Sequence, residues 1–369
     1  MTQMRENTDF MSTRALLALW VFIYHVDLYL NFSAVLGPAA GVVRRGYLAV
    51  DAFFILSGLI MARAHPELLR HSFRNVNPFF KPPSFSTIWR FWARRLGRVY
   101  PVHLATIGML AVLYLGGSAV GIAPHDPGRF SGSSLIENLF MVHAWGFPSH
   151  GEWNYPSWSL SAEWAGYLVF PIMWYMLAFW PSELSSSWIV LGTVFLGFLS
   201  AENNGSMNFE YQMSLVRFFP EFVMGMAISR TAHNCADFDI LRQGALKGGA
   251  VLTLVCLVVK FDMFAYVGLA AMLWGMLLQE VAEFPPVLPQ FAPVLWLGRI
   301  SYSFYMSFAI AELVVTQCYG HLGWAPQAHG WLFAAAMFGL TLALATVLNV
   351  VVEVPCRRAV NRWLDASAT

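Results

Sequence analysis

The sequence predicts an all-α protein, a bundle of transmembrane helices. Of its 369 residues, 57% are hydrophobic and only 12% are charged, whereas soluble domains contain about a quarter charged residues. The apolar residues also fall into long runs, and a soluble fold of this size could not bury so much apolar surface in one core. The net charge of +1 and the lack of a basic stripe argue against a nucleic-acid partner.

Ten stretches could each form a membrane-spanning helix, which needs about 20 mostly apolar residues. Arg5 and Arg14 stand before the apolar run of the first stretch, as in a signal peptide, but this stretch reaches spanning length without a clean cleavage site, so we expect it to be retained. Two stretches are short, which leaves the count open by one or two. The ten cover residues 13–32, 46–63, 100–121, 158–179, 187–200, 212–230, 246–259, 263–281, 294–315 and 329–352.

Positive residues predict the orientation of these helices, because Lys and Arg are enriched in cytoplasmic loops. Loop 122–157 contains only Arg129, so we expect it outside, and ten spans then place both termini in the cytoplasm. Arg44 and Arg45, on an outer loop, depart from this pattern. The predicted cytoplasmic loop 64–99 and its flank are rich in positive residues, namely Arg63, Arg70, Arg74, Lys81, Arg90, Arg94, Arg95 and Arg98.

The rest of the chain shows no sign of a second domain or of a metal site. The four cysteines, Cys235, Cys256, Cys318 and Cys356, are not paired at C-x-x-C spacing, so we interpret them as apolar residues rather than as disulfide partners or zinc ligands. No internal repeat stands out. We therefore expect one integral-membrane domain over residues 1–369 and no metal.

Arg14 and His25 are the first candidate functional residues. They are eleven residues apart on one predicted helix, which places them on the same face and about 16 Å apart along the axis. A histidine deep in a membrane span is costly and is a functional candidate by default. The alternatives are an interfacial anchor for Arg14 and an interhelical hydrogen bond for His25.

Two acids are expected at the same depth as this histidine. Asp51 and Glu163 each lie about 8 Å inside the predicted outer ends of their spans. An acid beside a histidine raises its basicity and fixes its tautomer, so His25, Asp51 and Glu163 are candidate catalytic residues. A structural ion-pair cluster among the helices is the alternative.

Other polar residues suggest binding roles. The planar guanidinium groups of Arg95 and Arg98 suit phosphate oxygens, although a positive cytoplasmic flank also explains them. Arg217 and Glu221 are spaced i, i+4, so we expect them to form an intramembrane ion pair, with sugar binding by Arg217 as the second possibility. Asn154 and Trp158, at the outer loop, suit a sugar but also suit an interfacial belt.

Several segments, in order, resemble one known family. Arg14 and His25 match an R-x10-H pattern, and GYLAVDAFFILSG (46–58), RRLGRVYP (94–101) and WSLSAEW (158–164) resemble three further signatures. Weaker blocks are RFFPEFVMG (217–225), LGRISYSFYMS (297–307) and VEVPCRR (352–358). The chain resembles membrane acyltransferase family three, which includes bacterial sugar O-acetyltransferases, over about residues 12–358.

Two features depart from the family pattern. The ninth-span block often ends in a histidine, and Phe308 stands in that neighbourhood here. The chain also ends at Thr369 without the soluble hydrolase-like domain of some members, so we expect a stand-alone version.

The resemblance implies an acyltransferase that uses cytoplasmic acetyl-CoA or another acyl-CoA as donor and a carbohydrate hydroxyl as acceptor, in a bacterial inner membrane. Arg14, Arg95 and Arg98 would bind the donor and His25 would act as general base. Asn154, Trp158 and Arg217 would contact the acceptor. Whether an acyl-histidine forms, which sugar is used and the oligomeric state stay open. The main alternative is a transporter or flippase for a lipid-linked sugar, since buried charges also mark transport paths, and a signalling or scaffold protein is the third.

Overall fold

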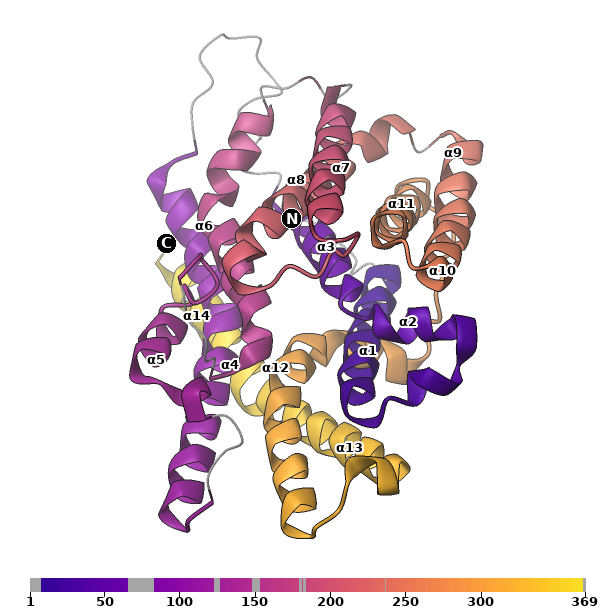
Figure 1. Cartoon of the computed structure of the whole chain (residues 1–369). Helices are drawn as coiled ribbons and strands as arrows, with labels where there is room; N and C mark the ends of the chain where they lie inside the picture. The colour runs from indigo at the N-terminus through magenta and orange to yellow at the C-terminus, as the bar shows by residue number, and fades with distance from the viewer. Residues whose placement is uncertain are drawn as a thin grey trace. The chain divides into compact units, whose positions relative to one another are not determined.

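The computed structural model is helical throughout the part of the chain that it describes (Figure 1). That part comprises residues 8–65, 83–122, 127–147, 153–178, 184–235 and 237–367, together with Pro181. Within it there are no strands, which confirms the predicted all-α class. Arg70, Arg74 and Lys81 lie outside the described residues.

The longer helices follow the order of the predicted spans, with short helical turns between them. Two π-helical turns, Gly244–Gly248 and Asn349–Glu353, join consecutive helices without a loop. The α-helices are α1 (Thr8–Leu30), α2 (Ala40–Arg44), α3 (Leu48–Ala64), α4 (Phe85–Ala119), α5 (Gly132–Leu139), α6 (Trp158–Ala178), α7 (Ser185–Glu202), α8 (Ser214–Cys235), α9 (Asp239–Gln243), α10 (Gly249–Val259), α11 (Asp262–Val281), α12 (Ala292–His321), α13 (Gly330–Leu348) and α14 (Val354–Ala366).

Six described helical segments are long and apolar enough to cross a membrane, or seven if α2 and α3, bent by 45°, form one broken span. The predicted short span 246–259 is longer in the structure, because α9 and a π-helical turn extend it to Asp239–Val259. Helices α6, α8 and α12 coincide with predicted spans but are not among these six segments. The prediction of ten spans stays a prediction.

The described helices group into two compact units. The first unit contains α1–α3, the end of α6, α7, most of α8, α9–α11 and the first turns of α12. The second contains α4, α5, most of α6, most of α12, α13 and α14.

Helices α3 and α8 of the first unit pack backbone to backbone through two glycines. A Cβ at Gly58 would lie 2.0 Å from the carbonyl oxygen of Phe222, and one at Gly225 would lie 2.0 Å from that of Ile55. Small residues of this kind let membrane helices approach closely. Asp51 precedes Gly58 by about two turns, and Arg217 precedes Gly225 by about two turns, so the glycine contact sets the register in which these two side chains meet.

Contacts at both ends of α3 and α11 fix the relative direction of these two helices in the first unit. At one end Asp262 contacts Arg45 and the backbone of Met207. At the other end Arg63 pairs with Glu280. Helices α3 and α11 therefore run in the same direction, because their first turns meet at one end and their last turns at the other.

The two arginines that departed from the positive-inside pattern are engaged locally. Arg45 forms an ion pair of 2.5 Å with Asp262. The Arg44 side chain donates to the Ser33 hydroxyl at 2.8 Å and to Asn31 at 3.4 Å. An arginine whose charge is neutralised by an ion pair does not act as a free positive charge in a loop. This ion pair explains why Arg45 is tolerated in a loop that is predicted to lie outside.

The second unit is organised along α4, which has 35 residues and starts well before the predicted span at residue 100. Ser84 caps its first turn by accepting from the Thr87 N–H at 3.3 Å. Helix α14 packs on this early part of α4, where Gly97 accommodates the side chain of Val360. The segment after α4 packs back on it through Phe130 and Trp153, which join the core formed by Ile107, Leu110 and Ile310.

The close contact of α3 and α8 yields a stability prediction. Gly225→Ala should lower the free energy of unfolding by about 1–3 kcal/mol, because its Cβ meets backbone atoms that cannot yield without separating the helices. Gly108→Ala, in a helix with open space around that position, is the matched control and should be neutral or slightly stabilising. Thermal unfolding of the purified proteins measures both, and equal midpoints would contradict the proposed packing.

Candidate active site

Helix α1 carries both Arg14 and His25, as predicted, and both are half-buried. The His25 ring lies edge-to-face with Tyr24, with ring centroids 5.1 Å apart. Tyr24 in turn meets Tyr47 edge-to-face, with centroids 5.8 Å apart. Two aromatic rings therefore connect His25 with the residue that precedes α3.

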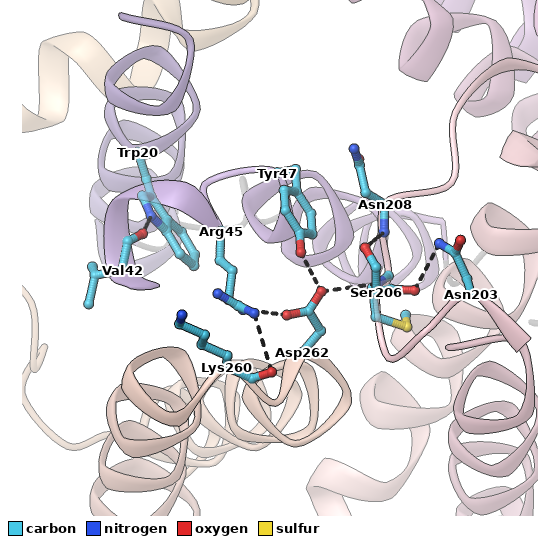
Figure 2. A network of polar contacts seen from close by, with 10 residues as sticks. Trp20, Val42, Arg45, Tyr47, Asn203, Ser206, Asn208, Lys260 and Asp262 are labelled. Carbon is cyan, nitrogen blue, oxygen red and sulfur yellow. Dashed lines mark hydrogen bonds and ion pairs between the residues drawn. The ribbon is translucent and has the colours of Figure 1, made fainter. Parts of the chain in front are cut away.

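Tyr47 belongs to a network centred on the buried carboxylate of Asp262 (Figure 2). This carboxylate accepts hydrogen bonds from the Tyr47 hydroxyl, from Arg45 Nε at 2.5 Å and from the Met207 N–H at 3.1 Å. Arg45 also donates to the Lys260 carbonyl at 3.2 Å. The network fixes three segments of the first unit against one another close to Tyr24.

Asp51 forms a buried ion pair with Arg217. Arg217 Nε donates to Asp51 Oδ1 at 2.8 Å and Nη2 donates to Oδ2 at 2.6 Å, and both side chains are 0% exposed. The predicted pairing of Arg217 with Glu221 on the same helix is wrong, because α3 brings a carboxylate that matches the guanidinium fork in both distances. Arg217 also donates to the Tyr47 carbonyl at 3.2 Å.

Glu163 lies in the second unit, in a polar cluster with the two arginines of α4. Its carboxylate accepts from the Tyr167 hydroxyl at 2.5 Å, and the charges of Glu163 and Arg98 both act on Arg95. The Tyr302 hydroxyl, within range of the same charges, donates to the Val99 carbonyl at 2.6 Å.

The sequence predicts Glu163 near the outer end of its span, and Arg95 and Arg98 at the cytoplasmic flank. The structure brings the three side chains together, so the separation implied by these expectations is wrong. The physical reason is the length of α4. This helix starts at Phe85, so both arginines are part of it and lie beside the first turns of α6. Trp92 Nε1 donates to the Tyr167 carbonyl at 3.1 Å and holds these helices together.

Asn154 and Trp158, the candidate acceptor-binding residues, are both buried. The Asn154 amide nitrogen donates to Thr106 Oγ1 and to the Met306 carbonyl, each at 3.1 Å. It therefore ties the segment before α6 to α4 and α12. Direct contact of either residue with an acceptor stays a prediction.

A second buried polar cluster lies beside Asn154, in the segment between α5 and α6. His143 Nε2 lies 3.0 Å from the Ser157 hydroxyl. The His143 ring stacks with that of His103 on α4, with centroids 6.0 Å apart, and His103 Nε2 lies 2.7 Å from the Asn138 carbonyl. Burial and the neighbouring His103 lower the pKa of His143 to about 3, which keeps this ring neutral at physiological pH.

Within the described ranges, no group of three or more His, Cys, Asp or Glu side chains is arranged to hold a metal ion. The polar groups of both units instead form ion pairs and hydrogen bonds between helices. Such an arrangement holds charged and titratable side chains in fixed positions.

A family model described as an acyltransferase domain matches residues 9–350. The chain belongs to this acyltransferase family. The acyltransferase MdmB of Streptomyces mycarofaciens is 26% identical over 351 residues, which cover 86% of this chain and 82% of that protein. No solved structure matches the chain. With its long apolar helices, the protein is a membrane-embedded acyltransferase.

In this acyltransferase, Phe308 lies where the ninth-span block of the family often has a histidine. Its ring packs edge-to-face against Tyr155 and Tyr305, with centroids 5.5 and 5.8 Å apart. The Tyr155 hydroxyl donates to Glu312. Phe308 therefore packs among aromatic rings and supplies no acid–base group.

Several residues in the polar networks of the two units were missed from the sequence. Tyr167 could have been found, because it follows Glu163 by four residues on a helix, the spacing of neighbouring side chains. Asp262 and Tyr302 gave no such signal, since the segments they contact are far away in the sequence.

The lowered pKa of His143 predicts acid sensitivity. An unfolded histidine takes up a proton near pH 6.5, whereas the folded chain keeps His143 neutral to about pH 3. Between these values the unfolded state binds more protons, so stability falls as pH falls, by about 2 kcal/mol between pH 7 and 5. His143→Gln should lose this share of the pH dependence. Unfolding midpoints of both proteins at pH 7 and 5 test it, and identical slopes would contradict it.

Proposed function

We propose that this acyltransferase moves an acyl group, acetyl in the simplest case, from cytoplasmic acyl-CoA to a carbohydrate hydroxyl. The acceptor would be a glycoconjugate such as an exopolysaccharide or a lipid-linked oligosaccharide in a bacterial inner membrane. The observation that carries the proposal is the placement of His25 and Arg14 on one membrane helix of a chain that belongs to an acyltransferase family.

In the proposed reaction His25 acts as general base. The acceptor oxygen attacks the thioester carbonyl while the imidazole takes the hydroxyl proton. The C–S bond then breaks, and the leaving thiolate of CoA takes the proton back from His25. Histidine suits this role because its ordinary pKa lies close to neutral pH.

We retain both predicted acids as participants. Asp51 belongs to the same unit as His25 and would contribute a fixed negative charge while it is paired with Arg217. Glu163 belongs to the other unit, where its hydrogen bond to Tyr167 orients the carboxylate. A carboxylate stabilises the positive charge that develops on a histidine base.

Arginines would bind the phosphates of the donor. We assign this role to Arg14, Arg95 and Arg98, because the guanidinium group offers a planar fork of donors to phosphate oxygens. The presence of Glu163 beside Arg95 and Arg98 limits the net positive charge there, so a phosphate would compete with a carboxylate already in place.

The acceptor is proposed to contact Asn154, Trp158 and Arg217. All three are buried, and Arg217 and Asn154 already bind protein groups. An acceptor would therefore reach them only with a rearrangement of these contacts.

His25→Ala should abolish transfer, with a loss of roughly two to four orders of magnitude in kcat, while the unfolding midpoint and donor binding change little. His321→Ala, an exposed histidine at the end of α12, is the matched control and should keep full activity. Release of CoA from labelled acetyl-CoA, with and without a sugar acceptor, measures the reaction.

Turnover of the His25→Ala protein at the wild-type rate would exclude the mechanism. Wild-type protein that never releases CoA with any acceptor would favour a transporter.

Arg98→Ala should raise the KM for the acyl-CoA donor by roughly 10- to 150-fold, because it removes a charge-assisted contact worth about 1.5–3 kcal/mol. Arg98→Lys should recover only part of the loss. Arg94→Ala is the control from the same helix, because this side chain is 39% exposed and pairs with Asp365 at 3.1 Å. Initial rates against donor concentration, normalised to folded protein, decide the matter. An equal KM for Arg98→Ala and Arg94→Ala would remove Arg98 from the donor site.

A further inference from the structure

The ion pair of Asp51 and Arg217 has a third buried member that the proposed reaction does not use. Glu221 follows Arg217 by one helical turn and is 0% exposed. Its position between Arg217 and Gly225, at i, i+4 spacing on both sides, places it on the face of α8 that packs against α3.

No hydrogen-bond donor reaches either carboxyl oxygen of Glu221 within the described part of the chain. Arg217 directs Nε and Nη2 to Asp51 and to the Tyr47 carbonyl. Tyr266 of α11 also faces this cluster, but its hydroxyl is directed to Met224 Sδ at 3.4 Å. The group within reach of Glu221 is the carboxyl of Asp51.

Two ionised carboxylates cannot form a hydrogen bond with each other, because neither has a proton to donate. The buried set would also carry one guanidinium against two carboxylates, leaving one negative charge without a partner. An unpaired buried charge is far more costly than a neutral carboxyl group in the same place. Two carboxyl groups that share a site therefore hold one proton between them.

We propose that Asp51 and Glu221 form a one-proton site between α3 and α8, in which Glu221 carries the proton and donates it to Asp51. Asp51 is the ionised member, because both of its oxygens accept from Arg217. The bound proton makes the set of Asp51, Glu221 and Arg217 electrically neutral, and neutrality allows the two helices to pack at the glycine contact. This site is separate from the proposed base, His25, and its test does not depend on transfer activity.

Infrared spectroscopy of the purified protein near neutral pH tests the proposal directly. A protonated carboxyl group has a carbonyl stretch that is separate from those of ionised carboxylates and that shifts in D₂O. We expect this band in the wild-type protein and its loss in Glu221→Gln. Glu353→Gln is the matched control, because Glu353 is also buried but accepts hydrogen bonds from Ser303 at 2.7 Å and from Asn349 at 2.9 Å, whereas neither oxygen of Glu221 accepts one from the described residues. The band should survive that change.

Stability provides a second measurement. Glu221→Gln should unfold at the wild-type midpoint, because the Gln amide can donate to Asp51 as the protonated acid does. Asp51→Asn should be clearly destabilised, because it leaves Arg217 charged and without its carboxylate. A wild-type spectrum without the band would overturn the proposal, whether or not the variants fold. A band that persists in Glu221→Gln, or equal destabilisation by both changes, would overturn the assignment of the proton to Glu221. If the infrared band is absent and the protein is stable in sodium salts but not in choline salts, a bound cation takes the place of the proton. That result would also overturn the proposal.

Discussion

The contact between α3 and α8 is the constraint on which the first unit depends. Gly58 and Gly225 let the two backbones touch, and this approach is possible only if the polar side chains on the same faces are matched. The pairing of Asp51 with Arg217 supplies that match in a region where an unpaired charge would be very costly. Close packing and charge neutrality are thus two aspects of one interface.

The same interface leads toward the proposed catalytic helix. Arg217 reaches the carbonyl of Tyr47, and the Tyr47 ring meets Tyr24 beside His25. Tyr47 is also held by Asp262, which joins α11 to the segments around Arg45 (Figure 2). The contacts around His25 therefore continue well beyond its own helix. Fixed surroundings of this kind are what a general base requires, because small displacements of a catalytic group are costly.

The second unit shows how helix length changes a functional argument. When α4 is taken to start at the membrane surface, Arg95 and Arg98 belong to a cytoplasmic loop and Glu163 to a distant layer. In the structure α4 starts at Phe85, and the three side chains share one cluster. The negative charge of Glu163 is then part of the environment in which any phosphate would bind. The donor role proposed for the two arginines and the role proposed for Glu163 would therefore be electrostatically coupled.

The sequence by itself determined the helical membrane class and the order of the helices, because apolar runs of spanning length have few alternatives. It also determined that Arg14 and His25 share a helix, since that follows from spacing within one element. Only the tertiary structure decided that Arg217 pairs with Asp51 rather than with Glu221. Local spacing offers Glu221 as a neighbour, but the partner is chosen by the glycine contact, which brings together residues 166 positions apart in the chain.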